Sequence, residues 1–202
     1  MKRLVRHGRW MLLLIVVLLA CRADRHLPSK RPVIVLVPIG PVPMAVLVHL
    51  QLGLPSILKR DVIIGAGIPL PGTAFVASRN QYLGSALLDD LEQHDVSQAE
   101  RVVGVIDADA FAPGLNFIFG QAKLPGRYAV VALPRLRDSF RGRPENVAKF
   151  VDRALKETVH ELGHTFGFEH CPNRKCVMHF SNSFGDTDYK DARFCEREHV
   201  PE

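Results

Sequence analysis

Short runs of consecutive apolar residues punctuate the chain between residues 33 and 133. Such runs, bounded by turn residues, are typical of strands whose two faces are both buried. We predict five of them, at residues 33–37, 61–64, 102–106, 117–120 and 128–133, and a Pro-Gly turn at residues 125–126 joins the last two.

Between and after these runs, apolar residues recur at helical spacing, which predicts helices at residues 42–52, 82–93 and 145–166. The alternation of strands and helices predicts an α/β fold with a mixed, mostly parallel sheet. Residues 33–202 are enough for one domain with its own core, without disulfide staples.

The end of the last predicted helix carries the most informative chemistry. His160 and His164 are four residues apart, so both imidazoles project from one helical face toward a shared metal ion. Glu161 stands beside the first histidine, where a general base for a metal-bound water is expected. A sharp turn at Gly167 would bring His170 back as a third nitrogen ligand. Three histidines leave one tetrahedral position open, which is typical of a catalytic zinc site.

Further residues make this pattern more specific than the histidine pair alone. A third histidine after a glycine, with a methionine downstream, defines the metzincin pattern, and Met178 stands where that methionine is expected. The alternative is an amphipathic helix with surface histidines and an ordinary core methionine. Five of the nine histidines fall in the last 43 residues, at positions 160, 164, 170, 179 and 199.

From His160 to Met178 the chain reads HExxHxxGxxHCxxxxCxM. This string resembles the archaemetzincins, metzincin zinc peptidases with a cysteine-bound structural zinc beside the catalytic one. Weaker similarity extends through the segments LNFIFGQA and VVALPRL. The resemblance implies a metzincin-like fold, with an active-site helix followed by a methionine turn. It also implies these roles: His160, His164 and His170 as catalytic-zinc ligands, Glu161 as base, Met178 in the turn, and Cys171, Cys176 and Cys195 as ligands of the structural zinc.

The sequence departs from the family pattern at this second zinc site. Archaemetzincins normally close it with a terminal CxxC pair, whereas Cys195 is followed here by Glu-Arg-Glu and then His199. We expect His199 as the fourth ligand, because three cysteines and one histidine form an established structural zinc set. Glu198 keeps the family spacing but is a harder ligand. Water, or no second zinc at all, remains an alternative.

A separate signal lies at the N-terminus. Lys2, Arg3, Arg6 and Arg9 precede an apolar run from Trp10 to Ala20, which is shorter than the roughly 20 residues of a membrane span. These proportions predict a secretory signal peptide. The stretch Leu18-Leu19-Ala20-Cys21 resembles a bacterial lipobox, which implies cleavage before Cys21 and its lipidation. A plain signal peptide or an uncleaved anchor is the alternative.

The chain is therefore predicted to divide into a signal peptide at residues 1–20, a lipidated cysteine and tether at residues 21–32, and a peptidase-like domain at residues 33–202. Export and lipidation would place the domain in the bacterial cell envelope, anchored to a membrane and facing the periplasm or the exterior. We expect a monomer.

Charge and cysteine counts change once the signal peptide is removed. The first 20 residues hold four of the 26 basic residues and no acids, so 22 Lys and Arg face 21 Asp and Glu, formally +1. The chain has no clustered basic patch, which argues against a nucleic-acid partner. If Cys21 is lipidated, three cysteines remain. A disulfide would leave one thiol over, whereas a zinc site would use all three, and we prefer zinc.

Several other residues invite a functional reading, and for most of them a structural one is favoured. Asp107 and Asp109 end a predicted strand, where aspartates more often satisfy turn amides than bind metal or transfer protons. Tyr189 is read as a packing residue rather than an oxyanion donor. His179 is read as a surface or supporting histidine, although it could line the cleft, and Glu169 as a solvated acid. The resemblance to metzincins implies that residues 116–120 form an edge strand beside the cleft that could pair with an extended peptide substrate; an ordinary edge strand is the alternative.

These features predict a zinc-dependent peptidase, acting as an aminopeptidase or a restricted endopeptidase, in which Glu161 activates a zinc-bound water. Its partners are peptides or proteins as substrates, and a membrane through the N-terminal lipid. The main alternative is a zinc-binding lipoprotein without efficient catalysis that acts as a binding module. A structural protein with an accidental motif would hold no zinc at all.

Overall fold

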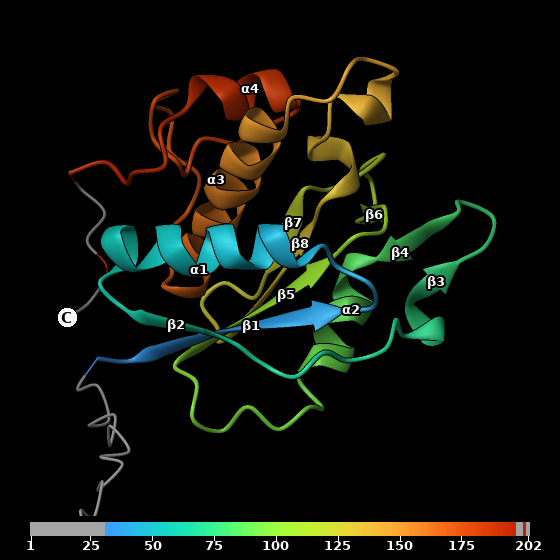
Figure 1. Cartoon of the computed structure of the whole chain (residues 1–202), viewed down its shortest axis with the longest axis horizontal. Coiled ribbons are helices and arrows are strands. Elements are labelled where there is room, and N and C mark those ends of the chain that lie inside the picture. The colour runs from blue at the N-terminus through green and yellow to red at the C-terminus, as the bar shows by residue number, and fades with distance from the viewer. Residues whose placement is uncertain (1–30, 197–199, 201–202) are drawn as a thin grey trace, which may run out of the picture.

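The computed structural model of the chain describes residues 31–196 and residue 200, drawn in colour in Figure 1. The predicted signal peptide, Cys21, most of the tether and His199 lie outside the described residues. A central sheet has the strand order β2-β1-β5-β8-β7. Its first four members are parallel, and the edge strand β7 runs antiparallel to β8, which confirms the predicted mixed, mostly parallel sheet. The bounds are β1 Val33–Ile39, β2 Asp61–Ile64, β5 Arg101–Ile106, β7 Gly120–Ala122 and β8 Tyr128–Ala132.

Helices cover both faces of this sheet (Figure 1). On one face lie α1 (Met44–Leu58) and the long helix α3 (Val147–Thr165), with the short α4 (Phe184–Tyr189) beside α3. On the other face lies α2 (Gly84–Leu91). A second, smaller sheet consists of β3 (Phe75–Val76), β4 (Gln81–Leu83) and β6 (Ala110–Phe111). Short 3-10 turns occupy Gly72–Ala74, Pro134–Leu136 and Ser139–Arg141.

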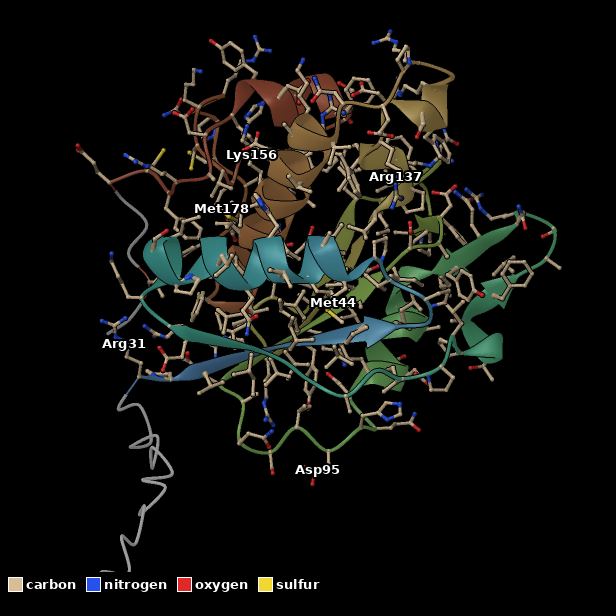
Figure 2. The ribbon with its side chains drawn as sticks, viewed as in Figure 1. Arg31, Met44, Asp95, Arg137, Lys156 and Met178 are labelled. Atoms are coloured by element: carbon tan, nitrogen blue, oxygen red, sulfur yellow. The ribbon has the colours of Figure 1, made fainter. Side chains whose placement is uncertain are left out.

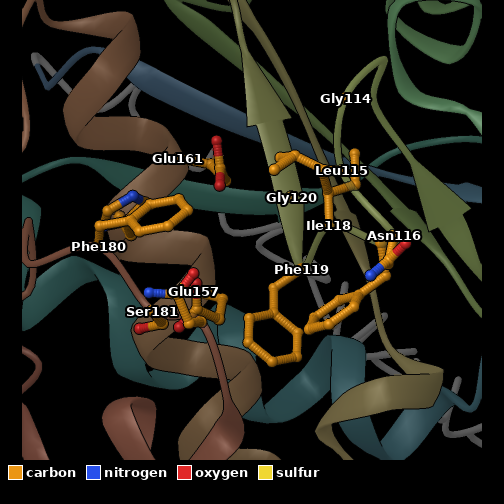
Figure 3. Close-up of a pocket in the computed structure, with 13 residues that line it drawn as sticks. Gly114, Leu115, Asn116, Ile118, Phe119, Gly120, Glu157, Glu161, Phe180 and Ser181 are labelled. Atoms are coloured by element: carbon orange, nitrogen blue, oxygen red, sulfur yellow. The ribbon is translucent and has the colours of Figure 1, made fainter.

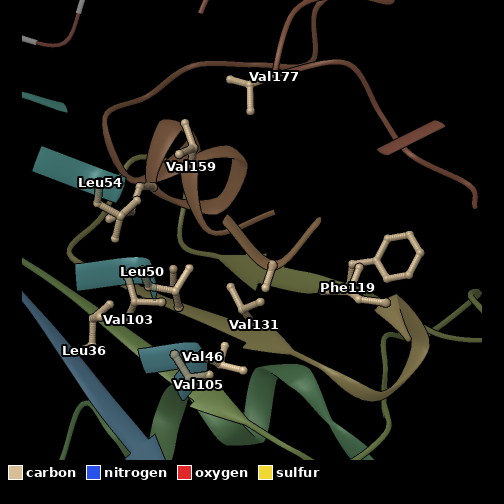
Figure 4. Packing of buried hydrophobic residues seen from close by; sticks show 14 of the residues in the cluster. Leu36, Val46, Leu50, Leu54, Val103, Val105, Phe119, Val131, Val159 and Val177 are labelled. Carbon is tan, nitrogen blue, oxygen red and sulfur yellow. The ribbon is translucent and has the colours of Figure 1, made fainter. Parts of the chain in front are cut away.

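The central strands are apolar throughout because each of them supplies two cores. In β1, Ile34 and Leu36 pack into the core beneath α1 and α3, while Val35 and Val37 pack into the core beneath α2. The other central strands alternate in the same way, as the period of two in a pleated strand requires. Figure 4 shows Leu36, Val103, Val105 and Val131 of the sheet meeting Val46, Leu50 and Leu54 of α1.

Helix α1 is longer than the sequence predicted. It continues from Gly53 through Pro55 to Leu58, although both residues are expected to interrupt a helix. Packing explains the continuation: a Cβ placed on Gly53 would lie 3.0 Å from a methyl group of Leu155, so α1 and α3 touch closely there. The helix stops at Lys59, whose left-handed conformation lets its N–H donate to the Pro55 carbonyl.

The predicted strand at residues 117–120 was wrong in its bounds. Ile118 pairs with Ala110 beside the small sheet, and only from Gly120 onward does the chain pair with β8. The segment is therefore shared between two sheets, which apolar character alone cannot reveal. The helix predicted at residues 82–93 begins at Gly84 in the structure, because residues 82 and 83 belong to β4.

Helix α3 is capped at its start and tied to its neighbours along its length. The Asn146 side chain accepts a hydrogen bond from the Lys149 amide at 3.0 Å and caps the first turn of α3. Midway along, Arg153 donates to Asp188 at 2.6 Å and to the Leu136 carbonyl at 2.8 Å, so one buried guanidinium joins α3 to α4 and to the preceding loop. Figure 2 shows the side chains of this layer, with Lys156 and Met178 marked.

Within residues 31–196 and 200, no helix combines the length and apolarity that crossing a bilayer requires.

The two faces of α1 predict different costs of truncation. Leu50 is fully buried and Leu52 is 75% exposed. We expect Leu50→Ala to lower the free energy of unfolding by about 3 kcal/mol, because the cavity it leaves cannot fill. Leu52→Ala should change it by less than about 0.5 kcal/mol. Urea denaturation of both variants measures this, and equal losses would contradict the packing described for α1.

Candidate metal centre and active site

The two helical histidines are fixed by backbone carbonyls. His160 Nδ1 lies 2.8 Å from the Val177 carbonyl oxygen, and His164 Nδ1 lies 2.7 Å from that of Phe168. A carbonyl oxygen can only accept, so each Nδ1 carries the proton and each Nε2 presents a lone pair. This arrangement orients both rings in the way that metal-binding histidines are commonly held.

Gly167 brings the third histidine to the same place, as predicted. Its φ of +94° is readily adopted by glycine, and the chain reverses there. The His170 ring then lies 5.3 Å from that of His160 and 4.9 Å from that of His164, centroid to centroid. Each of the three offers a ligand nitrogen, and these nitrogens all lie within 4.8 Å of one another.

The distance between the two helical nitrogens fits a shared zinc ion. His160 Nε2 and His164 Nε2 are 3.1 Å apart. Two nitrogens bound tetrahedrally at about 2.0–2.1 Å from one zinc lie about 3.3 Å apart. Two facing lone pairs at this separation repel each other unless a cation or a proton lies between them. The donor set therefore fits zinc.

Burial keeps the three imidazoles neutral, the form that binds metal. Burial, together with the charge of Lys190, lowers the pKa of His160 to about 3. Burial also lowers the pKa values of His164 and His170. Protons therefore compete weakly for these nitrogens near neutral pH.

Glu161 lies on the same helix and faces the cleft. Burial raises the pKa of its carboxyl well above the usual value, and the charge of Glu157 raises it further, while Lys190 lowers it. A carboxyl with a raised pKa can hold a proton near neutral pH, as a general base must do after it has acted. Opposite Glu161 stands Gly120, on which a Cβ would lie only 2.4 Å from the Glu161 Cγ. Only glycine leaves room for this carboxyl.

A methionine-containing turn lies beneath the histidines. Met178 is fully buried, and a Cβ on Gly163 would lie 2.3 Å from its sulfur, so the turn packs directly against α3. The Met178 carbonyl accepts a hydrogen bond from the Cys171 amide at 2.9 Å, and the neighbouring Val177 carbonyl orients His160. The turn predicted at this methionine is therefore in contact with α3, the helix that carries His160 and His164.

A cleft opens in front of this centre. Its lining comes from the chain segment 114–120 on one side, from Phe180, Ser181 and Asn182 on the other, and from Glu157, His160 and Glu161 of α3. Figure 3 shows Glu157 and Glu161 projecting from the helix between Phe180 and the segment that leads into β7.

Two residues of the site were not recognised in the sequence. Glu157 is buried one helical turn before Glu161, and its Oε1 lies 3.1 Å from Lys190 Nζ and 2.7 Å from the Thr187 hydroxyl. Its spacing of four residues from Glu161 was the available signal. Nothing in the sequence marks Lys190 as the partner, because it becomes a neighbour only when α4 folds against α3.

The three cysteines meet in a second cluster. The sulfur atoms of Cys171 and Cys195 are 3.6 Å apart, and the Cys195 amide donates to the Cys176 sulfur at 3.3 Å. All three sulfurs lie within 4.8 Å of one another, and none of these cysteines forms a disulfide. The Asn173 side chain donates to Cys195 at 3.4 Å. A group of three thiolates at this spacing can hold a metal ion.

The other candidate residues from the sequence have neighbours outside the histidine cluster. Asp107 and Asp109 have a structural role, as predicted, but their partners are Arg137 and Arg135 rather than turn amides. Three further candidates are not among the residues that line the cleft. Tyr189 stacks with Arg174 and Lys175, Glu169 is exposed, and His179 contacts the Cys171 carbonyl through Nδ1 at 3.0 Å.

Comparison with known proteins identifies the class. A family model described as Peptidase family M54 matches residues 58–199, more than half of the chain. The chain is 44% identical over 171 residues to an archaemetzincin of Pyrococcus abyssi, a match that covers 81% of this chain and 90% of that protein. It is 49% identical over 128 residues to an archaemetzincin of Methanopyrus kandleri, covering 63% and 69% of the two chains. The protein is therefore a zinc metallopeptidase.

Solved structures agree with this assignment. The crystal structure of the M. kandleri archaemetzincin superposes with a TM-score of 0.75 at 38% identity, covering 84% of this chain and 92% of that one. An archaemetzincin of Archaeoglobus fulgidus, complexed with malonate, gives a TM-score of 0.71 at 33% identity, covering 82% and 96%. The chain belongs to peptidase family M54, the archaemetzincins, which confirms the resemblance seen in the sequence.

The contact between Gly120 and Glu161 predicts a selective defect. Gly120→Ala should displace the Glu161 carboxyl and lower kcat/KM for peptide hydrolysis by about tenfold or more, while the three histidines still bind zinc. Gly72→Ala is the matched control, because a Cβ there meets no atom within 4 Å. Peptide hydrolysis and bound zinc are measured on both variants; full activity of Gly120→Ala would show that this contact does not position the base.

Proposed function

We propose that this zinc-dependent peptidase hydrolyses peptide bonds at the centre formed by His160, His164 and His170, with Glu161 as the general base. The observation that carries the proposal is that ligand nitrogens of the three histidines lie within 4.8 Å of one another, and that His160 lines a cleft together with the buried carboxyl of Glu161. A purely structural metal site has no use for a carboxyl at this position. The observed distance between the Nε2 atoms of His160 and His164 supports the choice of zinc.

When bound, zinc supplies Lewis acidity that acidifies water and polarises the scissile carbonyl. The chain's own contribution is the proton transfer. Glu161 takes a proton from the attacking water and passes it to the departing amine nitrogen, so the same carboxyl acts first as base and then as acid. Its raised pKa suits both roles, because the proton is held between the two steps.

The substrate lies as an extended peptide along the free edge of β7. In the described sheet β7 pairs only with β8, so its other edge is open beside the cleft. An extended chain can add to such an edge through backbone hydrogen bonds. Residues 116–119 continue from this edge into the cleft lining, where their side chains would contact the substrate.

Cleavage of internal bonds is favoured over trimming from the amino end. An aminopeptidase needs a carboxylate that is available to bind the substrate ammonium group. Among the described residues, the acids that line the cleft are Glu161 and Glu157, and Lys190 and Thr187 already contact Oε1 of Glu157. The cleft therefore offers a substrate ammonium little negative charge beyond the catalytic carboxyl.

A second zinc is proposed at Cys171, Cys176 and Cys195, where it would tie the turn after His170 to the C-terminal segment. The three sulfurs support this because they are close together and two of the cysteines are buried. His199 remains the proposed fourth ligand; it lies outside the described residues.

We also propose that the protein is exported and held to a membrane in the bacterial cell envelope through a lipid on Cys21. The support is the basic and apolar N-terminal sequence that ends in Leu-Leu-Ala-Cys.

Removal of the base tests the proposed reaction. We expect Glu161→Ala to bind zinc as the wild type does and to lose hydrolysis of a peptide library by about a hundredfold or more. Mass spectrometry of the products also separates internal cleavage from stepwise trimming. Retained hydrolysis would remove Glu161 from the mechanism. If both proteins hold zinc and cut no peptide, the protein acts as a zinc-binding module instead.

Loss of one thiolate tests the second zinc. Cys195→Ser should lower the zinc content of the purified protein from two ions to one and reduce its thermal stability, because a metal-held contact with the C-terminal segment is lost. Elemental analysis measures the metal. An unchanged zinc content would exclude Cys195 as a ligand.

A further inference from the structure

The outward side of α1 carries a row of apolar residues that has no partner among the described residues and that ends at the exposed Ser56. Met44, Val48 and Leu52 recur at every fourth position and are 60%, 40% and 75% exposed. This spacing places them on one side of the helix, and we call them the α1 stripe. Within Met44–Leu58 there is no Asp, Glu, Lys or Arg.

The core does not account for the α1 stripe. The inner side of the helix, with Val46, Leu47, Leu50 and Leu54, already fills the space above the sheet. Scattered exposed apolar residues are ordinary, but an aligned row on an uncharged helix indicates a surface that meets something apolar. Figure 1 shows α1 lying across the front of the molecule, outside the sheet.

The carboxyl end of α1 is basic and lies where the N-terminal segment joins the domain. Lys59 is exposed and ends the helix. Two residues later, the Asp61 amide donates to the Pro32 carbonyl at 3.1 Å, so the segment that leads back to Cys21 meets the domain beside this helix end. Arg31 is exposed at the same point and is marked in Figure 2.

Further basic residues lie along the neighbouring strand starts. The four parallel strands begin at one edge of the sheet, and an arginine stands at or just before each start: Arg31, Arg60, Arg101 and Arg127. Of the nearby acids Asp61 and Glu100, Glu100 forms an ion pair with Arg60 at 2.7 Å. Arg60 itself is buried, so we call Lys59, Arg31, Arg101 and Arg127 the basic edge.

We infer that the α1 stripe and the basic edge rest on an anionic phospholipid surface. An apolar row beside basic side chains is the combination that interfacial binding uses, since the apolar groups enter the headgroup region and the cations attract its charge. The N-terminal sequence supports this occupant, because its apolar run and its basic residues Arg22, Arg25 and Lys30 precede the point of attachment at Pro32.

The basic edge and the cleft lie at opposite ends of the sheet. Gly120, which lines the cleft, pairs with Val131 near the carboxyl end of β8. The basic edge lies at the amino ends of the same parallel strands. Contact between the basic edge and a membrane would therefore not cover Gly120, although α1 and α3 lie on the same face of the sheet.

Vesicle binding by a chain that starts at Arg31 tests the inference without the N-terminal segment. Both hydrophobic cores lie within the described residues, and a solved archaemetzincin matches 84% of this chain with 92% of its own length, so we expect this part of the chain to fold alone. We expect it to sediment with vesicles of phosphatidylcholine and phosphatidylglycerol about tenfold more strongly than with phosphatidylcholine alone, and less as salt is added. Equal or absent binding to the two vesicle types overturns the inference.

Two substitutions at Leu52 separate a membrane from a second protein copy. Leu52→Asp should weaken binding to the anionic vesicles about tenfold, whereas Leu52→Lys should retain most of it, because only the acid repels the lipid charge. Val147→Asp is the matched control, an apolar residue that is 66% exposed on α3, and it should bind as the wild type does. If the unmodified domain is a dimer that both Leu52 variants dissociate, the stripe is a subunit interface and the inference fails. Peptide hydrolysis in solution is measured separately, so its loss would count against the proposed peptidase and not against membrane binding.

Discussion

Two hydrogen bonds to backbone carbonyls hold the centre of this protein. The carbonyls of Val177 and Phe168 take the Nδ1 protons of His160 and His164 and turn both Nε2 lone pairs toward one point. Both carbonyls belong to the chain that follows α3, so the site exists only when that chain has folded back beneath the helix. The close contact between Gly163 of α3 and Met178 sets the distance between the helix and the chain that folds back beneath it.

A row of buried charges keeps the returning chain in place. Arg153 pairs with Asp188, and Glu157 pairs with Lys190, so two positions on α3 are tied to α4 and the residue after it. Burying such charges is costly unless each has a partner and further hydrogen bonds. Both buried ion pairs have such additional hydrogen bonds: the Leu136 carbonyl accepts one from Arg153, and the Thr187 hydroxyl donates one to Glu157. These ion pairs therefore fix the geometry of the α3 side of the cleft beside His160.

The sequence was most informative about the residues whose chemistry requires a fixed spacing along the chain. The histidines, Glu161 and the turn at Gly167 were expected from the residues alone, and the structure brings them together. Continuous apolar strands were also visible, because strands buried on both faces have no polar positions. The pairing of residues 116–122 could not be predicted, since a segment that pairs first with one sheet and then with another has no regular hydrophobic period.

Contacts between distant segments account for the remaining differences. Helix α1 passes through Pro55 because Leu155 packs closely against Gly53, a relation between residues about 100 positions apart. Lys190 reaches Glu157 in the same non-local way. The arginines at the strand starts looked dispersed in the sequence, and only the parallel register places them along one edge.

The most direct test of the account is anomalous diffraction at the zinc absorption edge from crystals of the zinc-loaded protein. The account requires a peak bounded by His160, His164 and His170, at about 2.0–2.1 Å from Nε2 of His160 and His164 and from one ring nitrogen of His170, with at least one coordination position not filled by protein. A peak at the cysteines alone, or a histidine site closed by a fourth side chain, would contradict it.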